Sequence, residues 1–175
     1  MALGGSTAIR TVPLGDGDAG VMQTLALMSQ LVERDMQVPR VVETARQLAV
    51  AQGAGSEYRT ALTIRAWLAR VWRFVGDPVT REHLEDADYL LRQYEALAYI
   101  PGDCDEAAIL GATLGKAVGI FASWTVLAFD DGTVRPRYAH VFATLYPNDG
   151  PSVSLDVTRP MQTTARVVRS YTVGA

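Results

Sequence analysis

The only cysteine of the chain, Cys104, stands in the segment GDCDEAAILG, where residue types and spacing could support nucleophilic chemistry. Asp103, followed three residues later by Glu106, matches a capping box and predicts that a helix begins at Cys104. A thiol in the first helical turn lies at the positive end of the helix dipole, beside backbone N–H groups without helical partners. That position favours a thiolate and could also hold a developing oxyanion.

The acidic neighbours of Cys104 act in the opposite direction. Asp103, Asp105 and Glu106 surround the sulfur with negative charge, which disfavours a thiolate. The thiol would therefore need a cationic or basic partner, and histidine is the usual one. A buried and inert cysteine is the alternative interpretation, because free cysteine is often a small core residue.

The chain contains two histidines, and they lie in different kinds of segment. His83 stands in the polar segment TREHLED and is predicted to be a surface residue. His140 stands in YAHVFATLY, residues 138–146, whose alternation predicts a strand. The segment SVSLDVT, residues 152–158, alternates in the same way, and PNDG between the two predicts a turn.

A hairpin folded near Asn148 would place Asp156 opposite His140 or one diagonal step away. Opposite residues on paired strands have Cβ atoms about 4.5–5.5 Å apart, within reach of an imidazole–carboxylate hydrogen bond. The sequence therefore predicts a triad in which His140 takes the proton of Cys104 and Asp156 orients the imidazole. A purely structural histidine–aspartate pair is the alternative.

The remaining pattern predicts the elements that would position this triad. Helical spacing predicts helices in the first half, and β-branched and aromatic alternation predicts strands in the second half. The predicted helices are 19–35, 41–51, 57–74, 85–96 and 104–118, and the predicted strands are 121–129, 138–146, 152–158 and 161–173. Gly111 and Gly115 fall on one stripe of the last helix, which predicts a closely packed sheet. Helices followed by strands predict an α+β fold with an antiparallel sheet.

Three blocks of sequence, in order, resemble the transglutaminase-like superfamily and its small microbial and tailed-phage members. They are GDCDEAAILGATLGKAVGI, YAHVFATLY and SLDVTRP, and the resemblance covers roughly residues 57 to 160. It implies a papain-like core in which a catalytic helix packs on an antiparallel sheet, with Cys104 as nucleophile, His140 as base and Asp156 as orienting acid. One departure is Val157, where many relatives carry proline.

The resemblance implies acyl transfer on amide bonds through a thioester. The acceptor could be water, as in a peptidase or amidase, or an amine, as in transglutaminase-type cross-linking of a protein or peptide substrate. The alternative is a non-catalytic module, for example a tailed-phage virion component that keeps the fold and binds structural-protein partners. The predicted organisation is a flexible arm over 1–20, a helical region over 21–55 and a transglutaminase-like catalytic domain over 56–175.

Composition excludes several other classes of function. A net charge of −3 and a pI near 5.3 argue against nucleic-acid binding. No run of about 18 apolar residues predicts a membrane span, and the N-terminus does not have the pattern of a signal peptide. One cysteine and two distant histidines predict no metal cluster, and no cofactor motif is present. The expected location is cytoplasmic, or the virion if the chain is phage-encoded.

Overall fold

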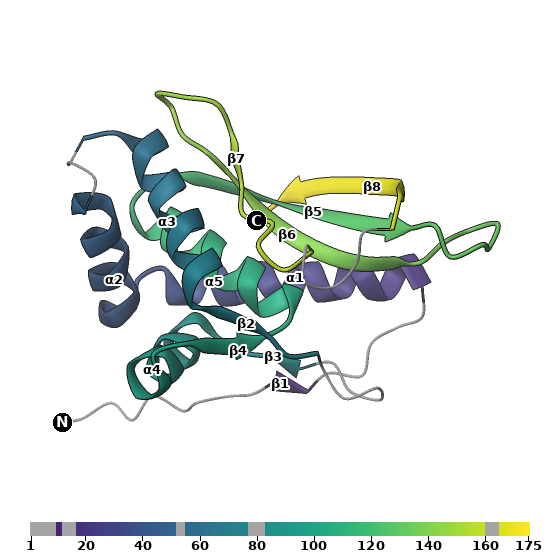
Figure 1. Cartoon of the computed structure of the whole chain (residues 1–175), viewed down its shortest axis with the longest axis horizontal. Helices are drawn as coiled ribbons and strands as arrows, with labels where there is room; N and C mark the ends of the chain where they lie inside the picture. Colours follow the sequence, from purple (N-terminus) through teal and green to yellow (C-terminus); the bar gives the residue numbers. More distant parts are fainter. Residues whose placement is uncertain (1–9, 12–16, 52–54, 77–82, 160–164) are drawn as a thin grey trace.

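The structure is a computed structural model that describes residues 10–11, 17–51, 55–76, 83–159 and 165–175. Helices form one layer against a four-stranded antiparallel sheet (Figure 1). The helices are α1 (Gly17–Asp35), α2 (Pro39–Val50), α3 (Glu57–Val71), α4 (Ala87–Leu97) and α5 (Cys104–Ala117). The prediction of an α+β fold with an antiparallel sheet is therefore confirmed.

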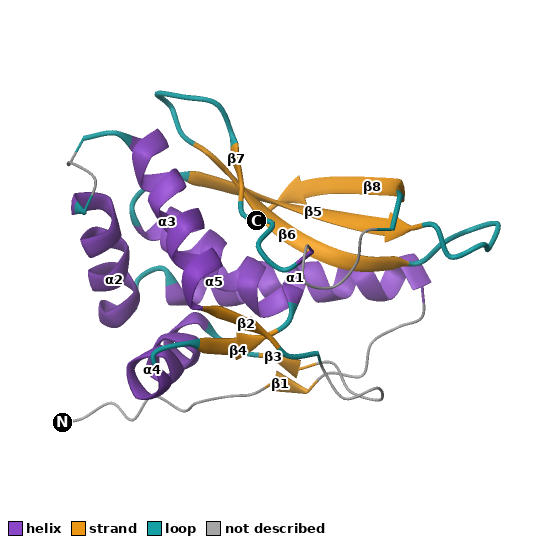
Figure 2. Cartoon of the chain, viewed as in Figure 1, coloured by secondary structure: helices purple, strands orange, loops and turns teal. Residues whose placement is uncertain are grey.

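The main sheet has the strand order β7-β6-β5-β8 (Figure 2). Its strands are β5 (Phe121–Phe129), β6 (Tyr138–Tyr146), β7 (Val153–Ser154) and β8 (Val167–Gly174). Two smaller pairs lie outside it: the antiparallel pair β1 (Arg10–Thr11) with β3 (His83–Leu84), and the parallel pair β2 (Trp72–Phe74) with β4 (Ile100–Gly102). Within the described ranges, no helix combines the length and apolar character needed to cross a membrane.

Several predicted boundaries need correction. The predicted arm over 1–20 contains the two-residue strand β1 and the first turn of α1. Its residues 1–9 and 12–16 lie outside the described residues. β7 is two residues long rather than seven, because the chain leaves the ladder after Ser154. The last strand begins at Val167, and residues 161–164 of its predicted span lie outside the described residues. His83, predicted to be a surface residue, lies on β3 and is only partly exposed.

α5 lies at the centre of the fold and is buried along nearly its whole length. The sheet packs closely against its glycine stripe, as predicted. A Cβ added at Gly111 would lie 2.6 Å from Leu155 Cδ1, and one added at Gly115 would overlap the fully buried side chain of Leu145. Because α1 and α2 contribute residues to the same core cluster as the sheet, the N-terminal helices help to hold α5 in place. The predicted division at residue 56 stays a prediction.

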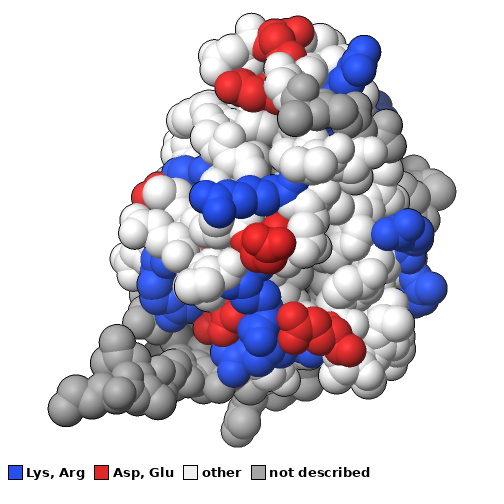
Figure 3. Space-filling view, turned by 90° about the vertical axis from the view of Figure 1, so that its left-hand side faces the viewer, with Lys and Arg blue, Asp and Glu red and all other residues white. Residues whose placement is uncertain are grey.

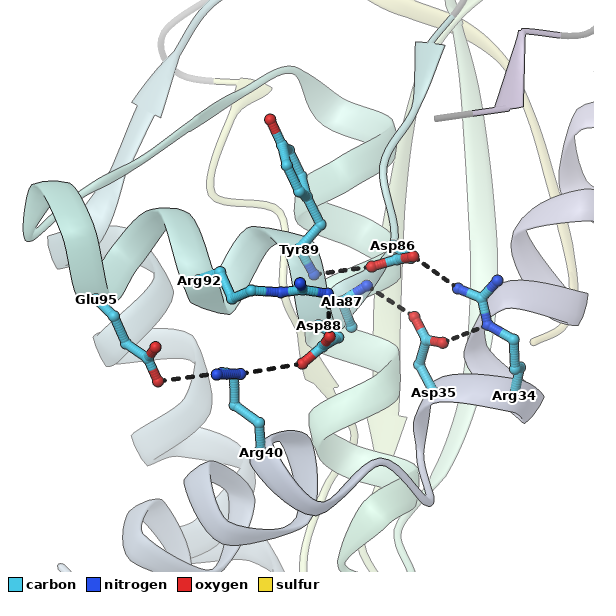
Figure 4. Close-up of polar contacts among 9 residues, drawn as sticks. All are labelled: Arg34, Asp35, Arg40, Asp86, Ala87, Asp88, Tyr89, Arg92 and Glu95. Carbon is cyan, nitrogen blue, oxygen red and sulfur yellow. Dashed lines mark hydrogen bonds and ion pairs between the residues drawn. The ribbon is translucent and has the colours of Figure 1, made fainter. Parts of the chain in front are cut away.

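A network of charged residues joins the end of α1 to the start of α4 (Figure 4). The carboxylate of Asp35, 1% exposed, accepts hydrogen bonds from Arg34 Nε at 2.6 Å and from the Ala87 N–H at 2.9 Å. Arg34 also binds Asp86 at 2.9 Å, and Asp86 caps α4 by accepting from the Tyr89 N–H at 2.8 Å. The buried aspartates therefore satisfy the first backbone N–H groups of α4.

A second set of ion pairs on the same side of the molecule is more exposed. Arg40 of α2 bridges Asp88 at 3.3 Å and Glu95 at 3.1 Å, both on α4, and Asp88 also pairs with Arg92. Figure 3, which views this side, shows charges of both signs interspersed across the surface. Exposed pairs of this kind contribute little stability, roughly 0–1 kcal/mol each.

Candidate active site

Cys104 is the first residue of α5, as the capping-box pattern predicted. The carboxylate of Asp103 accepts from the Asp105 N–H at 3.0 Å, and Glu106 Oε2 accepts from the Asp103 N–H at 3.0 Å. The chain reaches this point along β4, where the Gly102 carbonyl accepts a hydrogen bond from Trp72 Nε1 at 3.1 Å. These bonds fix the thiol at the start of a buried helix.

The surroundings of the Cys104 thiol favour its protonated form. Its S–H donates to Asp105 Oδ1 at 3.3 Å. Burial, and then the charges of Asp105 and Asp103, raise the pKa of Cys104 well above that of an ordinary thiol. The Val141 N–H, which donates to the sulfur, lowers this pKa but does not offset the other effects. Burial and the neighbouring acids therefore dominate the surroundings of the thiol.

The short β7 strand explains why Val141 can reach the thiol. The Leu155 N–H donates to the Ala143 carbonyl at 2.8 Å, so the backbone groups of Ala143 point toward the β7 edge of β6. Backbone groups two residues apart in a strand point the same way, so Val141 faces the same edge. Because the β6–β7 ladder includes only Thr144 and Leu145 of β6, the Val141 N–H is available to Cys104.

His140 and Asp156 form the predicted pair. His140 Nε2 lies 2.8 Å from Asp156 Oδ1, and the imidazole is fully buried. The ladder pairs Thr144 with Ser154, which places Asp156 one diagonal step from His140. A bulge beside His140 is a feature that the sequence did not reveal: Leu127 pairs with His140 and Ala128 pairs with Tyr138. Bulges often re-aim a side chain at a functional site.

The contact with Asp156 involves His140 Nε2 and leaves Nδ1 as the other ring nitrogen. In a neutral imidazole whose Nε2 donates to a carboxylate, Nδ1 carries the lone pair. The Arg159 N–H donates to the same Oδ1 at 3.2 Å and holds the carboxylate in place. Within the described structure, His140 Nδ1 is buried and has no hydrogen-bond partner. The pair therefore presents an unused basic nitrogen.

Cys104 and His140 line one cavity of about 350 Å³. Its other walls come from α1, the start of α5, β5 and β6; they are Gly17, Gly20, Val21, Thr24, Leu25, Met28, Asp103, Asp105, Val126, Tyr138, Ala139 and Val141. The structure thus brings His140 and Asp156 into contact and places the thiol in the same cavity as the imidazole. Among the described interactions, the thiol proton is directed to Asp105 rather than to His140.

One wall of this cavity was missed in the sequence. Val21, Leu25 and Met28 of α1 line the cavity, and the sequence predicts only that they belong to a helix over 19–35. Their helical spacing is typical of any buried helix, so it does not distinguish a core face from a cavity wall. The proximity of α1 to Cys104 depends on packing between segments about 80 residues apart in the chain, which periodicity does not report.

Three side chains at the start of α5 could act together as metal ligands. One donor atom from each of Asp103, Cys104 and Asp105 lies within 4.8 Å of the others. The expectation of no metal cluster rests on cysteine and histidine ligands alone and leaves out the flanking carboxylates. Oxygen ligands favour hard cations and a thiolate favours softer ones, so this set does not select one class of metal.

Replacing Asp105 with asparagine is expected to make Cys104 more reactive. The substitution removes the nearest negative charge, so the pKa of Cys104 falls, and a fall of one unit gives about ten times more thiolate below the pKa. Iodoacetamide alkylation, followed by intact-mass spectrometry at pH 7, measures the rate directly because the chain has one cysteine. Glu43→Gln, on the exposed side of α2, is the control for the same charge change. An unchanged or slower rate in Asp105→Asn would contradict this account.

Comparisons with known proteins add a fold relationship. No family model and no curated protein matches the chain. The crystal structure of a "putative protease" from Parabacteroides distasonis ATCC 8503 is similar, with a TM-score of 0.52 and 16% identity, over 83% of this chain and 30% of that one. A "putative cysteine protease" from Cytophaga hutchinsonii gives a TM-score of 0.46 and 16% identity, over 95% and 59% of the two chains.

The chain spans less than two thirds of the length of each of these two proteins. The similarity to the Parabacteroides protein shows that the chain shares its α+β fold, and the mixed helix and sheet layers described above agree with that result. The chain is therefore similar in fold to a protein described as a protease.

Proposed function

We propose that this chain catalyses cysteine-dependent acyl transfer on amide bonds and belongs to the transglutaminase-like superfamily. One observation carries the proposal: His140 Nε2 contacts Asp156, while His140 Nδ1 is buried without a hydrogen-bond partner among the described residues, in the wall of the cavity that contains the Cys104 thiol. A thiol, a base and an orienting carboxylate are the parts that nucleophilic catalysis requires. The fold shared with a putative protease supports an amide substrate.

The proposed first step transfers the thiol proton to His140 Nδ1 while Sγ attacks the substrate carbonyl carbon. The tetrahedral oxyanion would accept hydrogen bonds from the Cys104 N–H, which has no helical partner at the start of α5. Collapse breaks the C–N bond, and the leaving amine takes the proton from the His140 imidazolium. This leaves a thioester on Cys104, which water or an amine then attacks as His140 removes its proton.

The raised pKa of Cys104 decides how the thiol is activated. A thiolate–imidazolium pair at rest requires a thiol that ionises easily, and the carboxylates of Asp103 and Asp105 oppose ionisation. His140 must therefore remove the proton during the attack, as a general base. The thiol must also turn from Asp105 Oδ1 toward Nδ1 before it reacts.

Trapping the acyl-enzyme tests the proposal. The protein is mixed with p-nitrophenyl acetate, and separately with a library of amide-capped peptides, and intact-mass spectrometry measures acyl adducts on the parent and on Cys104→Ala. The proposal predicts a burst of p-nitrophenol and a thioester adduct on the parent alone. Equal adducts on both proteins, or none on the parent, would rule it out.

A further inference from the structure

Three arginines gather around the start of α1, at one end of the thiol cavity. Arg135 and Arg137 come from the loop between β5 and β6, and Arg169 comes from β8. Together with Gly17, Asp18 and Pro136, they line a second cavity of about 360 Å³. Figure 1 shows the β5–β6 hairpin end and the N-terminal end of α1 on the same side of the molecule.

This arginine cluster already binds a carboxylate of the chain itself. Asp18 Oδ2 accepts from Arg135 Nη2 at 2.6 Å and from Arg169 Nη2 at 3.1 Å. The hydrogen bond from Arg169 is the main reason that the pKa of Asp18 lies below its ordinary value. Three guanidinium groups and one carboxylate leave an excess of positive charge among the described residues that line this cavity.

Arg169 is held in a fixed position that links this cluster to the thiol cavity. Its Nη1 donates to the Pro136 carbonyl at 3.0 Å, and its guanidinium lies 4.6 Å from the centre of the Tyr138 ring. Tyr138 lines the thiol cavity, and Gly17 lines both cavities. The two cavities are therefore neighbours, separated by the start of α1 and by Tyr138.

The two cavities carry opposite charge. Asp103 and Asp105 lie beside the thiol, while the arginines lie in the neighbouring cavity. The lining of the thiol cavity also includes apolar residues, among them Val21 and Val126. A substrate with a carboxylate would avoid the acidic end and be attracted to the arginine end, because planar guanidinium groups match carboxylate geometry.

We propose that Arg135, Arg137 and Arg169 form a subsite that binds a carboxylate of the acyl-donor substrate, at a distance from the bond that Cys104 attacks. This inference rests on the proposed function, because the substrate must present its carbonyl to Cys104. The carboxylate is supplied by an acidic side chain or by a free chain terminus. Arg137 is exposed and lines the cavity, so it is the arginine whose substitution least disturbs the ion pairs of Asp18.

Tailed alkylating reagents test the subsite without requiring turnover. Iodoacetamides carrying six-carbon tails that end in a carboxylate, a methyl group or an ammonium group are compared by the rate at which they alkylate Cys104. The carboxylate tail is expected to react about three- to fivefold faster than the methyl tail in the parent protein, the size expected for one exposed ion pair. The ammonium tail is expected to be slowest, and the preference is expected to decrease with added salt.

Matched variants test whether Arg137 causes the faster reaction of the carboxylate-tailed reagent. Arg137→Glu is expected to remove the carboxylate preference, and Arg46→Glu, which makes the same charge change on the exposed face of α2, is expected to keep it. Two peptide reagents, iodoacetyl-Ala-Ala with a free carboxyl terminus and iodoacetyl-Ala-Glu-amide, distinguish a terminal carboxylate from a side chain. An equal preference in Arg137→Glu and the parent, or no preference in the parent, would overturn the subsite.

The outcomes also separate the subsite from the proposed function. A carboxylate preference that depends on Arg137, in a protein that forms no acyl-enzyme, would support the subsite and reject the acyl-transfer function. An acyl-enzyme formed without any carboxylate preference would support the function and reject the subsite.

Discussion

Replacing Asp156 with asparagine is expected to slow acyl-enzyme formation on Cys104 by about 10²- to 10⁴-fold at neutral pH. Asp156 accepts the proton of His140 Nε2 at 2.8 Å and so keeps Nδ1 free to act as a base. An asparagine amide can donate to Nε2, which would move the ring proton to Nδ1, and Nδ1 could then no longer accept the thiol proton. Single-turnover acylation by p-nitrophenyl acetate measures the effect.

Two controls separate this orienting role from a structural one. At high pH hydroxide generates the thiolate, so iodoacetamide is expected to alkylate Cys104 in Asp156→Asn at the parent rate. Asp149→Asn, an exposed aspartate that contacts the Tyr58 N–H, is expected to leave acylation unchanged. Equal acylation rates in Asp156→Asn and the parent would show that His140 needs no orienting carboxylate.

Replacing Asp35 with alanine is expected to lower the free energy of unfolding by about 2–4 kcal/mol. The substitution leaves the buried Ala87 N–H without its acceptor and removes the bond from Arg34. Arg34 keeps Asp86 as a partner and is partly exposed, so the cost stays below that of a fully buried unpaired charge. The urea midpoint, measured by circular dichroism, tests this prediction.

The exposed ion pair between Arg40 and Glu95, in the second set of ion pairs, provides the control. Glu95→Ala breaks only the contact with Arg40, which lies on the surface, and is expected to change stability by no more than about 1 kcal/mol. If Asp35→Ala and Glu95→Ala shifted the urea midpoint equally, burial of Asp35 would not be the source of its stabilising effect.

The sequence predicted the parts of the site that depend on local patterns. The capping box set the start of α5, aromatic and β-branched residues followed by a turn signal set the bounds of β5, and alternation set the bounds of β6. The predicted hairpin left Asp156 either opposite His140 or one diagonal step away, and the pairing of Thr144 with Ser154 gives the diagonal placement. Each of these features arises within one or two neighbouring elements.

The features that the sequence did not reveal depend on contacts between distant segments. The cluster formed by Arg135 and Arg169 with Asp18 joins residues more than 100 positions apart. The wall that α1 provides lies about 80 positions from Cys104 in the chain. The pKa of the Cys104 thiol also depends on contacts between distant segments, because it is set in part by burial and by the Val141 N–H. The identity of the substrate, the acceptor in the second step and any role in an assembly stay predictions.

The rate of acetyl-enzyme formation in His140→Ala, with and without added imidazole, tests the central claim most directly. The account predicts that Cys104 is acetylated by p-nitrophenyl acetate about 10²- to 10⁴-fold more slowly in this variant at pH 7. It also predicts that free imidazole, which fits the space left by the missing side chain, restores part of the rate. Acetylation at the parent rate without imidazole would contradict the claim that His140 is the base for Cys104.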